Sequence, residues 1–212
     1  MIHVASFAFN PFQENTYVLY DETKECIIID PGCYTANEQK RLEAFIAKEE
    51  LKPVRLINTH CHLDHICGNA FVSQQYGLHL EAHEGEQVVL DASIDHGKMY
   101  GFVFEPSPNI MHAIQEGDAI QFGNSTLKVL FTPGHSPASI SLYSDQDKFV
   151  IAGDVLFFMS IGRTDLPGGN HDLLLQSIRE KLFTLPDETI VYNGHGQKTQ
   201  IAFEKLNNPF FK

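Results

Sequence analysis

The sequence reads Thr59-His60-Cys61-His62-Leu63-Asp64-His65 just after the apolar run Val54–Ile57. Imidazole nitrogens and carboxylate oxygens are the ligands that zinc and related divalent metals take. Alternation after a strand would place His60 and His62 on one side of the chain and His65 elsewhere. A single metal does not need four ligand-type side chains so close together, whereas two neighbouring metals do. The stretch therefore predicts a binuclear metal site at a strand end, and the alternative is a polar turn that happens to hold histidines.

Three later segments repeat the pattern of a hydrophobic strand that runs into a glycine-containing turn with one metal-ligand side chain. Glycine lets the backbone bend sharply and approach a site closely. The three turns are Thr132-Pro133-Gly134-His135, Ile151-Ala152-Gly153-Asp154 and Asn193-Gly194-His195. Together with the first stretch, they predict strand ends that converge on one edge.

At these residues the chain resembles the metallo-β-lactamase superfamily. The order His-x-His-x-Asp-His, followed by His135, Asp154 and His195, is similar to the metal motifs of that family. Asp30, which ends the apolar run Ile27–Ile29, is similar to its first motif. The resemblance covers essentially the whole chain and points within the family to a short, single-domain form of the glyoxalase II (hydroxyacylglutathione hydrolase) branch. Three stretches carry that likeness: Asn10–Tyr17, Gly162–Asn170 and Asn208–Phe210.

The resemblance implies an α/β fold, a four-layer αββα sandwich, with two divalent metal ions. Zinc is the metal expected, with iron or manganese as alternatives, because His and Asp sites accept several metals according to availability. The first metal would be held by His60, His62 and His135, and the second by Asp64, His65 and His195. Asp154 would bridge the two metals, and Asp64 and Asp154 would be the catalytic carboxylates.

Three further residues are candidates for supporting roles. Asp30 is expected to orient a ligating histidine, since such rings usually donate their other N–H to a carboxylate or carbonyl. Alternatively, or in addition, Asp30 caps the turn at Pro31-Gly32. Arg163 and Lys198 are candidates to bind a substrate carboxylate, although an Arg after a strand is more often part of a structural ion pair.

The predicted activity is hydrolysis of S-lactoylglutathione or a similar small hydroxyacyl thioester by a metal-bridging hydroxide, because metal binding lowers the pKa of water to about 7. One alternative is a mononuclear iron persulfide dioxygenase of the same fold, which would need only His60, His135 and Asp154. Another is a lactonase or other small-ester hydrolase. Antibiotic hydrolysis is disfavoured, because the secreted β-lactamase branches lack the bridging aspartate that Asp154 resembles. Only Gly196–Lys212 follows the last ligand, so the helical domain that supplies much of the glutathione site in two-domain relatives is not expected.

Composition sets the remaining expectations. A chain of 212 residues with 43% hydrophobic residues predicts one domain spanning residues 1–212 with an ample core. There is no apolar run of membrane-spanning length. The start, Met1–Phe7, is not typical of a signal peptide, which favours a cytoplasmic location and free buried cysteines. The formal net charge of −12, with thinly scattered basic residues, argues against a nucleic-acid partner. A small-molecule substrate is the partner expected, and the oligomeric state stays open.

Hydrophobic periodicity and turn residues predict the elements along the chain. The expected strands are Ile2–Phe7, Thr16–Asp21, Glu25–Asp30, Val54–Asn58, Leu78–Glu81, Ala119–Phe122, Ser125–Phe131, Ser139–Ser144, Phe149–Ala152 and Thr189–Tyr192. The expected helices are Ala36–Glu50, Gly68–Tyr76, His83–Asp91, Asp172–Leu182 with Asn170 as its N-cap, and Thr199–Leu206. Residues 95–108 are expected to be irregular, either as a cover over a substrate cleft or as a packed surface loop.

Overall fold

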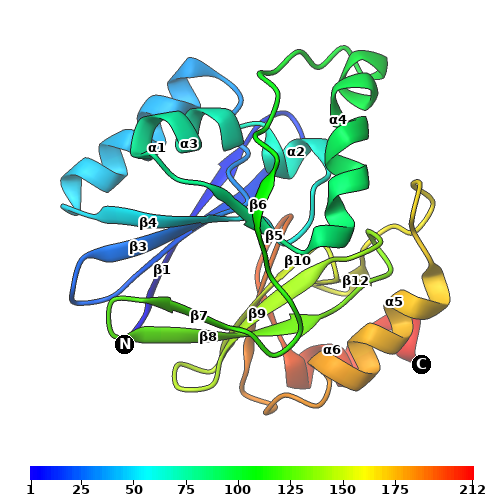
Figure 1. Ribbon diagram of the computed structural model, residues 1–212. Helices are drawn as coiled ribbons and strands as arrows, with labels where there is room; N and C mark the ends of the chain where they lie inside the picture. The colour runs from blue at the N-terminus through cyan, green and yellow to red at the C-terminus, as the bar shows by residue number, and fades with distance from the viewer.

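The computed structural model describes residues 1–212 and contains two six-stranded sheets that pack face to face (Figure 1). The first sheet has the order β1-β2-β3-β4-β5-β6: His3–Phe9, Glu14–Tyr20, Glu25–Ile29, Lys52–Ile57, Leu80–Ala82 and Ile110–Ala113. The second has the order β14-β13-β10-β9-β8-β7: Thr199–Gln200, Ile190–Asn193, Phe149–Gly153, Ile140–Ser144, Ser125–Phe131 and Ala119–Phe122.

Helices cover the outer faces of both sheets, with α1 and α3 on the first and α5 and α6 on the second (Figure 1). The helices are α1 Ala36–Lys48, α2 Leu63–Ile66, α3 Asn69–Tyr76, α4 Gln87–Met99, α5 His171–Ser177 and α6 Ile201–Asn207. Short helical turns are η1 Glu84–Glu86, the π-helical turn η2 Ile178–Leu182 and η3 Pro209–Phe211. No helix combines the length and apolar character that crossing a membrane requires.

Three separate hydrophobic clusters fill the spaces between the four layers. Strand β3 shows why, since successive side chains on a strand point to opposite faces. Cys26 and Ile28 pack toward the helices of the first sheet, whereas Ile27 and Ile29 pack between the two sheets. A third cluster joins the second sheet to α5 and α6. The predicted αββα sandwich is therefore confirmed.

The strand directions bring the functional segments to one edge. Strands β3, β4 and β5 are mutually parallel, and so are β10 and β13. Strand β8 runs in the same direction as β10, because both pair antiparallel with β9. The carboxyl ends of β3, β4, β8, β10 and β13 consequently deliver their turns to a shared edge, as the repeated strand–turn pattern predicted.

Several predicted boundaries are wrong. Helix α4 extends to Met99 through part of the 95–108 segment predicted to be irregular, and β6 was not predicted at all. A Cβ on Gly97 would lie 2.9 Å from the carbonyl oxygen of Phe102, so this glycine allows close packing of the following segment on α4 rather than ending the helix. The final helix begins at Ile201, because Thr199–Gln200 pairs with β13.

Other local predictions agree with the structure. The side chain of Asn170 caps α5 by accepting a hydrogen bond from the backbone N–H of Leu173 at 3.0 Å. All four cysteines are buried and free. A small hairpin that was not predicted, β11 Leu156–Phe157 with β12 Ser160–Ile161, follows Asp154.

Asp21 joins the two sheets and gives the fold a defined acid sensitivity. Its buried carboxylate accepts hydrogen bonds from the backbone and hydroxyl of Thr23 and, across to the second sheet, from the backbone of Asn124 and the hydroxyl of Ser125. Burial alone would raise the pKa of Asp21, but these bonds, led by the Thr23 hydroxyl, lower it to about 2.

A lowered pKa in the folded state stabilises the protein above the unfolded-state pKa of about 3.9, and this contribution disappears as pH falls toward 2. We therefore expect Asp21→Asn to cost about 2 kcal/mol of unfolding free energy near pH 6 and almost nothing near pH 2. Urea denaturation at a series of pH values measures this difference. Asp91→Asn, on the exposed surface of α4, is the control. A cost for Asp21→Asn that does not change with pH would contradict the linkage.

Candidate metal centre

Three histidines form a nitrogen-rich group at the shared edge of the sheets. His60 and His62 follow β4, and His135 follows β8. The Nε2 atom of His135 lies 2.8 Å from His62 Nδ1 and 3.2 Å from His60 Nε2. One ligand-type nitrogen from each ring therefore lies within 4.8 Å of the other two. Three imidazole nitrogens directed at one point form a pocket for a cation.

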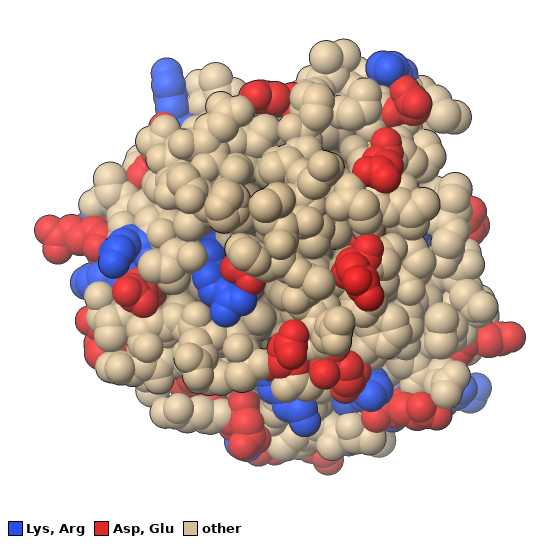
Figure 2. Space-filling view, viewed as in Figure 1, with Lys and Arg blue, Asp and Glu red and all other residues tan.

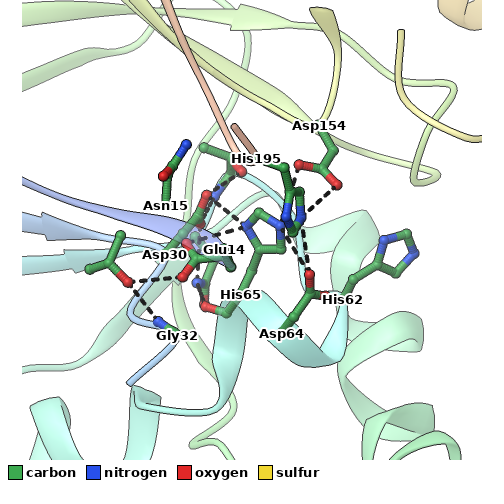
Figure 3. Close-up of polar contacts among 12 residues, drawn as sticks. Glu14, Asn15, Asp30, Gly32, His62, Asp64, His65, Asp154 and His195 are labelled. Carbon is green, nitrogen blue, oxygen red and sulfur yellow. Dashed lines mark hydrogen bonds and ion pairs between the residues drawn. The ribbon is translucent and has the colours of Figure 1, made fainter. Parts of the chain in front are cut away.

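A second group, richer in carboxylate, consists of Asp64, His65 and His195, which Figure 3 shows together with Asp154. His195 Nε2 is 3.1 Å from Asp64 Oδ2, and His65 Nε2 is 3.7 Å from the same oxygen. Asp154 lies between the two groups, because its oxygens are within 3.5 Å of the Nε2 atoms of His65, His135 and His195. The structure thus brings together all seven residues predicted to bind metal.

Close approach of the backbone makes this packing possible. A Cβ on Gly194 would lie 2.0 Å from Asp154 Oδ1 and 2.8 Å from the His65 ring. Any larger residue would push the His195 turn away from Asp154. The glycine of this turn therefore has the role that the sequence pattern indicated.

The histidines of the two groups have pKa values shifted in opposite directions. Burial, followed by repulsion from neighbouring imidazoles, lowers the pKa of His60 well below its usual value and that of His62 to about 3. Burial would also lower the pKa of His65 and His195, but Asp154 and Asp64 outweigh it and raise the pKa of His195 to about 9. The nitrogen-rich group is therefore neutral at pH 7, which is the form of imidazole that binds a cation.

Backbone and hydroxyl oxygens hold the outer nitrogens of three rings. His135 Nδ1 lies 2.7 Å from the carbonyl oxygen of Arg163, and His195 Nδ1 lies 3.1 Å from that of Phe12. His60 Nδ1 is 3.1 Å from the Thr59 hydroxyl. Each contact leaves Nε2 of the ring directed into the site, which is the usual way in which a protein orients a metal-binding histidine.

Two carboxyl groups lie behind His65 (Figure 3). Asp30 Oδ2 is 3.2 Å from His65 Nδ1 and also accepts a hydrogen bond from the Thr59 hydroxyl, while its other oxygen accepts from the Thr59 backbone. Glu14, which is fully buried, places Oε1 3.9 Å from the same His65 nitrogen. Asp30 therefore lies behind the ligand group, as predicted. The turn at Gly32 is held by the hydroxyl of Thr16.

Hydrogen bonds from the segment Asn10–Asn15 connect the turns that follow strands of the first sheet to the His195 turn of the second sheet. Asn10 Nδ2 donates to the carbonyl oxygens of Gly32 and Asp64 at 3.0 and 2.9 Å. Asn15 donates its backbone N–H to Gly194 and its side-chain amide to the carbonyls on either side of the Gly194–His195 pair. The family resemblance included this segment, but the hydrogen bonds by which it connects the two sheets are visible only in the structure.

Glu86 is a functional candidate that sequence reasoning missed. Its carboxylate is fully buried and accepts hydrogen bonds from the backbone of Cys61, the hydroxyl of Ser136 and the backbone of Ala138. These donors flank the histidines that follow β4 and β8, so one carboxylate links two ligand-bearing turns. Nothing in the local sequence distinguishes Glu86 from its exposed neighbour Glu84, because the partners come from distant segments.

We expect Glu86→Gln to weaken metal binding by about 10- to 100-fold, the usual cost of losing a group that orients ligands. An amide offers one acceptor oxygen where the carboxylate offers two, so at least one buried donor loses its partner, at about 1–3 kcal/mol of stability. Competition with a chelating dye measures metal affinity, and urea denaturation measures stability. Glu84→Gln, on the same helical turn but exposed, is the matched control. Equal metal affinities for both variants would show that Glu86 does not position the turns.

A cleft of about 910 Å³ opens onto these residues. Five of the seven line it: His62, Asp64, His135, Asp154 and His195. Helix α4 forms one wall, including His96 and Met99 from the segment whose role the sequence left open. Most of the rest of residues 95–108 does not line the cleft.

The two predicted substrate-binding cations differ in position. Arg163 lines the cleft, but its guanidinium makes two contacts of 2.7 Å with Asp165, which is the structural ion pair considered as the alternative. Lys198 is not among the lining residues, and its Nζ lies 5.6 Å from the centre of the Tyr192 ring. The structure therefore does not bring Lys198 to the candidate site.

The donor set fits two divalent cations. His65 Nε2 and Asp154 Oδ1 are buried without any hydrogen-bond partner, which is costly unless a cation binds them. In the first group, His62 Nδ1 and His60 Nε2 lie 2.8 and 3.2 Å from His135 Nε2, and the three nitrogens are directed at one point, as the ligands of a single cation are. One nitrogen-rich and one carboxylate-containing group on either side of Asp154 match the arrangement of a binuclear site.

Comparison with known proteins identifies the family. The family model of the metallo-β-lactamase superfamily matches residues 9–195. A probable metallo-hydrolase, YqgX of Bacillus subtilis, is 39% identical over 94% of this chain and 93% of its own length. Hydroxyacylglutathione hydrolase GloC of Haemophilus influenzae is 34% identical over 94% and 93%. The chain belongs to the metallo-β-lactamase superfamily and is a metal-dependent hydrolase.

Solved structures agree with this assignment. BLEG-1, described as a B3 metallo-β-lactamase, is 36% identical with a TM-score of 0.91 over 99% of this chain and 100% of its own. TTHA1623, solved in a di-iron-bound form, is 31% identical with a TM-score of 0.88 over 98% and 100%. The second neighbour carries two metal ions, as the ligand groups of this chain suggest, and shows that the metal in this fold can be iron.

Proposed function

We propose that this protein is a binuclear metal-dependent thioesterase of the glyoxalase II type, which cleaves S-lactoylglutathione or a similar hydroxyacyl thioester. The observation that carries the proposal is the position of Asp154 between two ligand groups at the floor of a cleft of substrate size. The name of the relative GloC, which matches this chain over nearly its full length, supports the thioester class.

The ligand assignment follows the two groups. His60, His62 and His135 would hold the first metal, Asp64, His65 and His195 the second, and Asp154 both. Zinc is the metal proposed, and iron is the alternative that elemental analysis distinguishes. When bound, the metal pair supplies an activated water molecule and polarises the substrate carbonyl.

The chain itself performs the remaining tasks. Asp64 and Asp154 line the cleft, so their carboxylates would hold the metals beside a bound substrate. The wall formed by α4 bounds the space in which the thioester would bind. In the net reaction the water oxygen bonds to the carbonyl carbon and the carbon–sulfur bond breaks. The sulfur leaves as a thiol, and the acid product releases one proton at neutral pH.

We expect the metal-loaded enzyme to hydrolyse S-lactoylglutathione with a KM at or above about 1 mM, the upper end of the usual range. Arg163 is the one Lys or Arg side chain that lines the cleft, and Asp165 already neutralises it, so the carboxylates of glutathione find few partners. Loss of contacts that bind the substrate and the transition state equally raises KM more than it lowers kcat.

Loss of thioester absorbance over a substrate series measures this constant. Oxygen uptake with glutathione persulfide, run on the iron form, tests the dioxygenase alternative in parallel. Steady oxygen consumption without thioester hydrolysis, at full metal loading, would overturn the thioesterase proposal.

Hydrolysis of a β-lactam is the second candidate, because BLEG-1 is described as a B3 metallo-β-lactamase and is 36% identical to this chain. Nitrocefin turnover, measured beside thioester hydrolysis on one metal-loaded sample, ranks the two activities by kcat/KM. The thioesterase proposal requires the thioester to be the better substrate.

A further inference from the structure

Helix α4 presents apolar side chains to the cleft as well as to the core. Val88, Ala92, His96 and Met99 follow helical spacing on one face, and all four line the cleft. Leu90 lies on the other side of the helix and packs into the hydrophobic core of the first sheet. Three of these four side chains, those of Val88, Ala92 and Met99, are apolar although they do not belong to the core.

These apolar side chains are exposed to solvent. Val88 is 65% exposed, Met99 80% and Tyr100 61%, and all three line the cleft. Phe12, on the opposite turn, is 43% exposed and also lines it. Single exposed hydrophobic residues are ordinary, but several around one cleft mark a ligand-binding surface.

The same cleft has few Lys or Arg side chains that would bind an anionic ligand. Its single guanidinium, on Arg163, is paired with Asp165. Lys98 is on α4 but is bound to Asp95 at 2.9 Å and is not among the lining residues. Basic side chains are also scattered on the face of the molecule shown in Figure 2, with no continuous patch.

We propose that the wall formed by Val88, Ala92, Met99 and Tyr100 binds a hydrocarbon acyl group, and that these residues determine substrate specificity. The inference rests on the proposed thioesterase function, because the wall shares one cleft with Asp64 and Asp154. Within the proposed class of thioesters, it specifies an acyl group whose aliphatic chain is longer than that of lactoyl. The small polar lactoyl group leaves this wall uncovered.

An acyl series on one neutral thiol tests the proposal. Acetyl, butanoyl, hexanoyl and octanoyl thioesters of N-acetylcysteamine keep the leaving group constant and uncharged. Burial of each added methylene is expected to raise kcat/KM by about two- to fourfold until the wall is covered. The hexanoyl thioester should therefore exceed the acetyl thioester by about twentyfold or more.

Substitutions in the wall test whether these side chains cause the preference for longer acyl groups. We expect the double variant Val88→Ser, Met99→Ser to reduce the ratio of hexanoyl to acetyl kcat/KM by about tenfold. Both positions are exposed, so folding should be retained, as circular dichroism and metal content check. Met111→Ser removes a 60% exposed methionine on β6 that does not line the cleft, and should leave the ratio unchanged.

The outcomes separate the inference from the function on which it rests. Equal kcat/KM values along the series, with the acetyl thioester hydrolysed, would overturn the acyl preference and leave the thioesterase intact. An unchanged ratio in the double variant would show that the wall does not carry the preference. Absence of cleavage of every thioester at full metal loading would overturn both proposals.

Discussion

Asp154→Ala is expected to lower kcat/KM by about a thousandfold, the scale seen when a principal electrostatic group is removed from an active site. The carboxylate contacts three histidines from both ligand groups and has one oxygen without any other partner. Gly194, which packs directly against Asp154, has no side chain that could take its place. The measurement is steady-state hydrolysis of a thioester beside metal content by elemental analysis.

His79→Ala is the control for this prediction. His79 is exposed, lies edge-to-face with His112 and is outside the cleft, so its loss should change kcat/KM by less than about twofold. Comparable losses in the two variants at equal metal loading would show that Asp154 has been assigned the wrong role.

Removal of metal is expected to lower the melting temperature by about 10 °C. A ligand present at about 1,000 times its Kd stabilises the folded state by about 4 kcal/mol. For a chain of this size, each kcal/mol shifts the melting temperature by about 2–4 °C. Without a cation, the neutral nitrogens of His60, His62 and His135 face one another and the buried Asp154 Oδ1 has no hydrogen-bond partner. Thermal unfolding of chelated and reconstituted protein measures the shift.

The number of metal equivalents that restores the melting temperature tests the assignment of two metals. Titration should restore the melting temperature with two equivalents of metal, and Asp64→Ala, which removes one ligand of the second group, should retain only one. Asp91→Asn should bind two equivalents like the unmodified protein, since Asp91 is exposed on α4 and does not line the cleft. Saturation of the unmodified protein by one equivalent, with no further shift, would contradict the assignment of two metals.

The ligand residues were predictable because their signal is local. A strand followed by a glycine turn and a His or Asp is a short-range pattern, and strand ends in α/β folds meet at one edge. The seven residues that the pattern and the family resemblance selected do lie together. The order of strands in the two sheets came from the resemblance, since hydrophobic periodicity does not specify which strands pair.

Errors in the predicted elements have physical causes. Gly97 lies in the segment predicted to be irregular, and glycine costs about 1 kcal/mol in a helix interior. In the fold, the missing side chain lets the segment at Phe102 and Phe104 pack against α4. Strand β6 is short and largely exposed at the edge of its sheet, so its sequence shows no alternation of buried and exposed residues.

The sequence by itself determined the chemistry of the site: which residues can bind metal, in what order, and that strand ends present them. Only the tertiary structure decided which contacts position the ligand residues and which side chains line the cleft beside them. Glu86 and the Asn10–Asn15 turn join segments far apart in the chain, and their partners are identified by contact rather than by spacing. Arg163 and Lys198 are both candidates from the sequence to bind a substrate carboxylate, yet Arg163 is paired with Asp165 beside the cleft and Lys198 lies outside it. The apolar residues of α4 that line the cleft likewise have the sequence pattern of an ordinary core-facing helix. A hydrophobic pattern indicates which side chains are apolar, but it does not show whether the core or a substrate covers them.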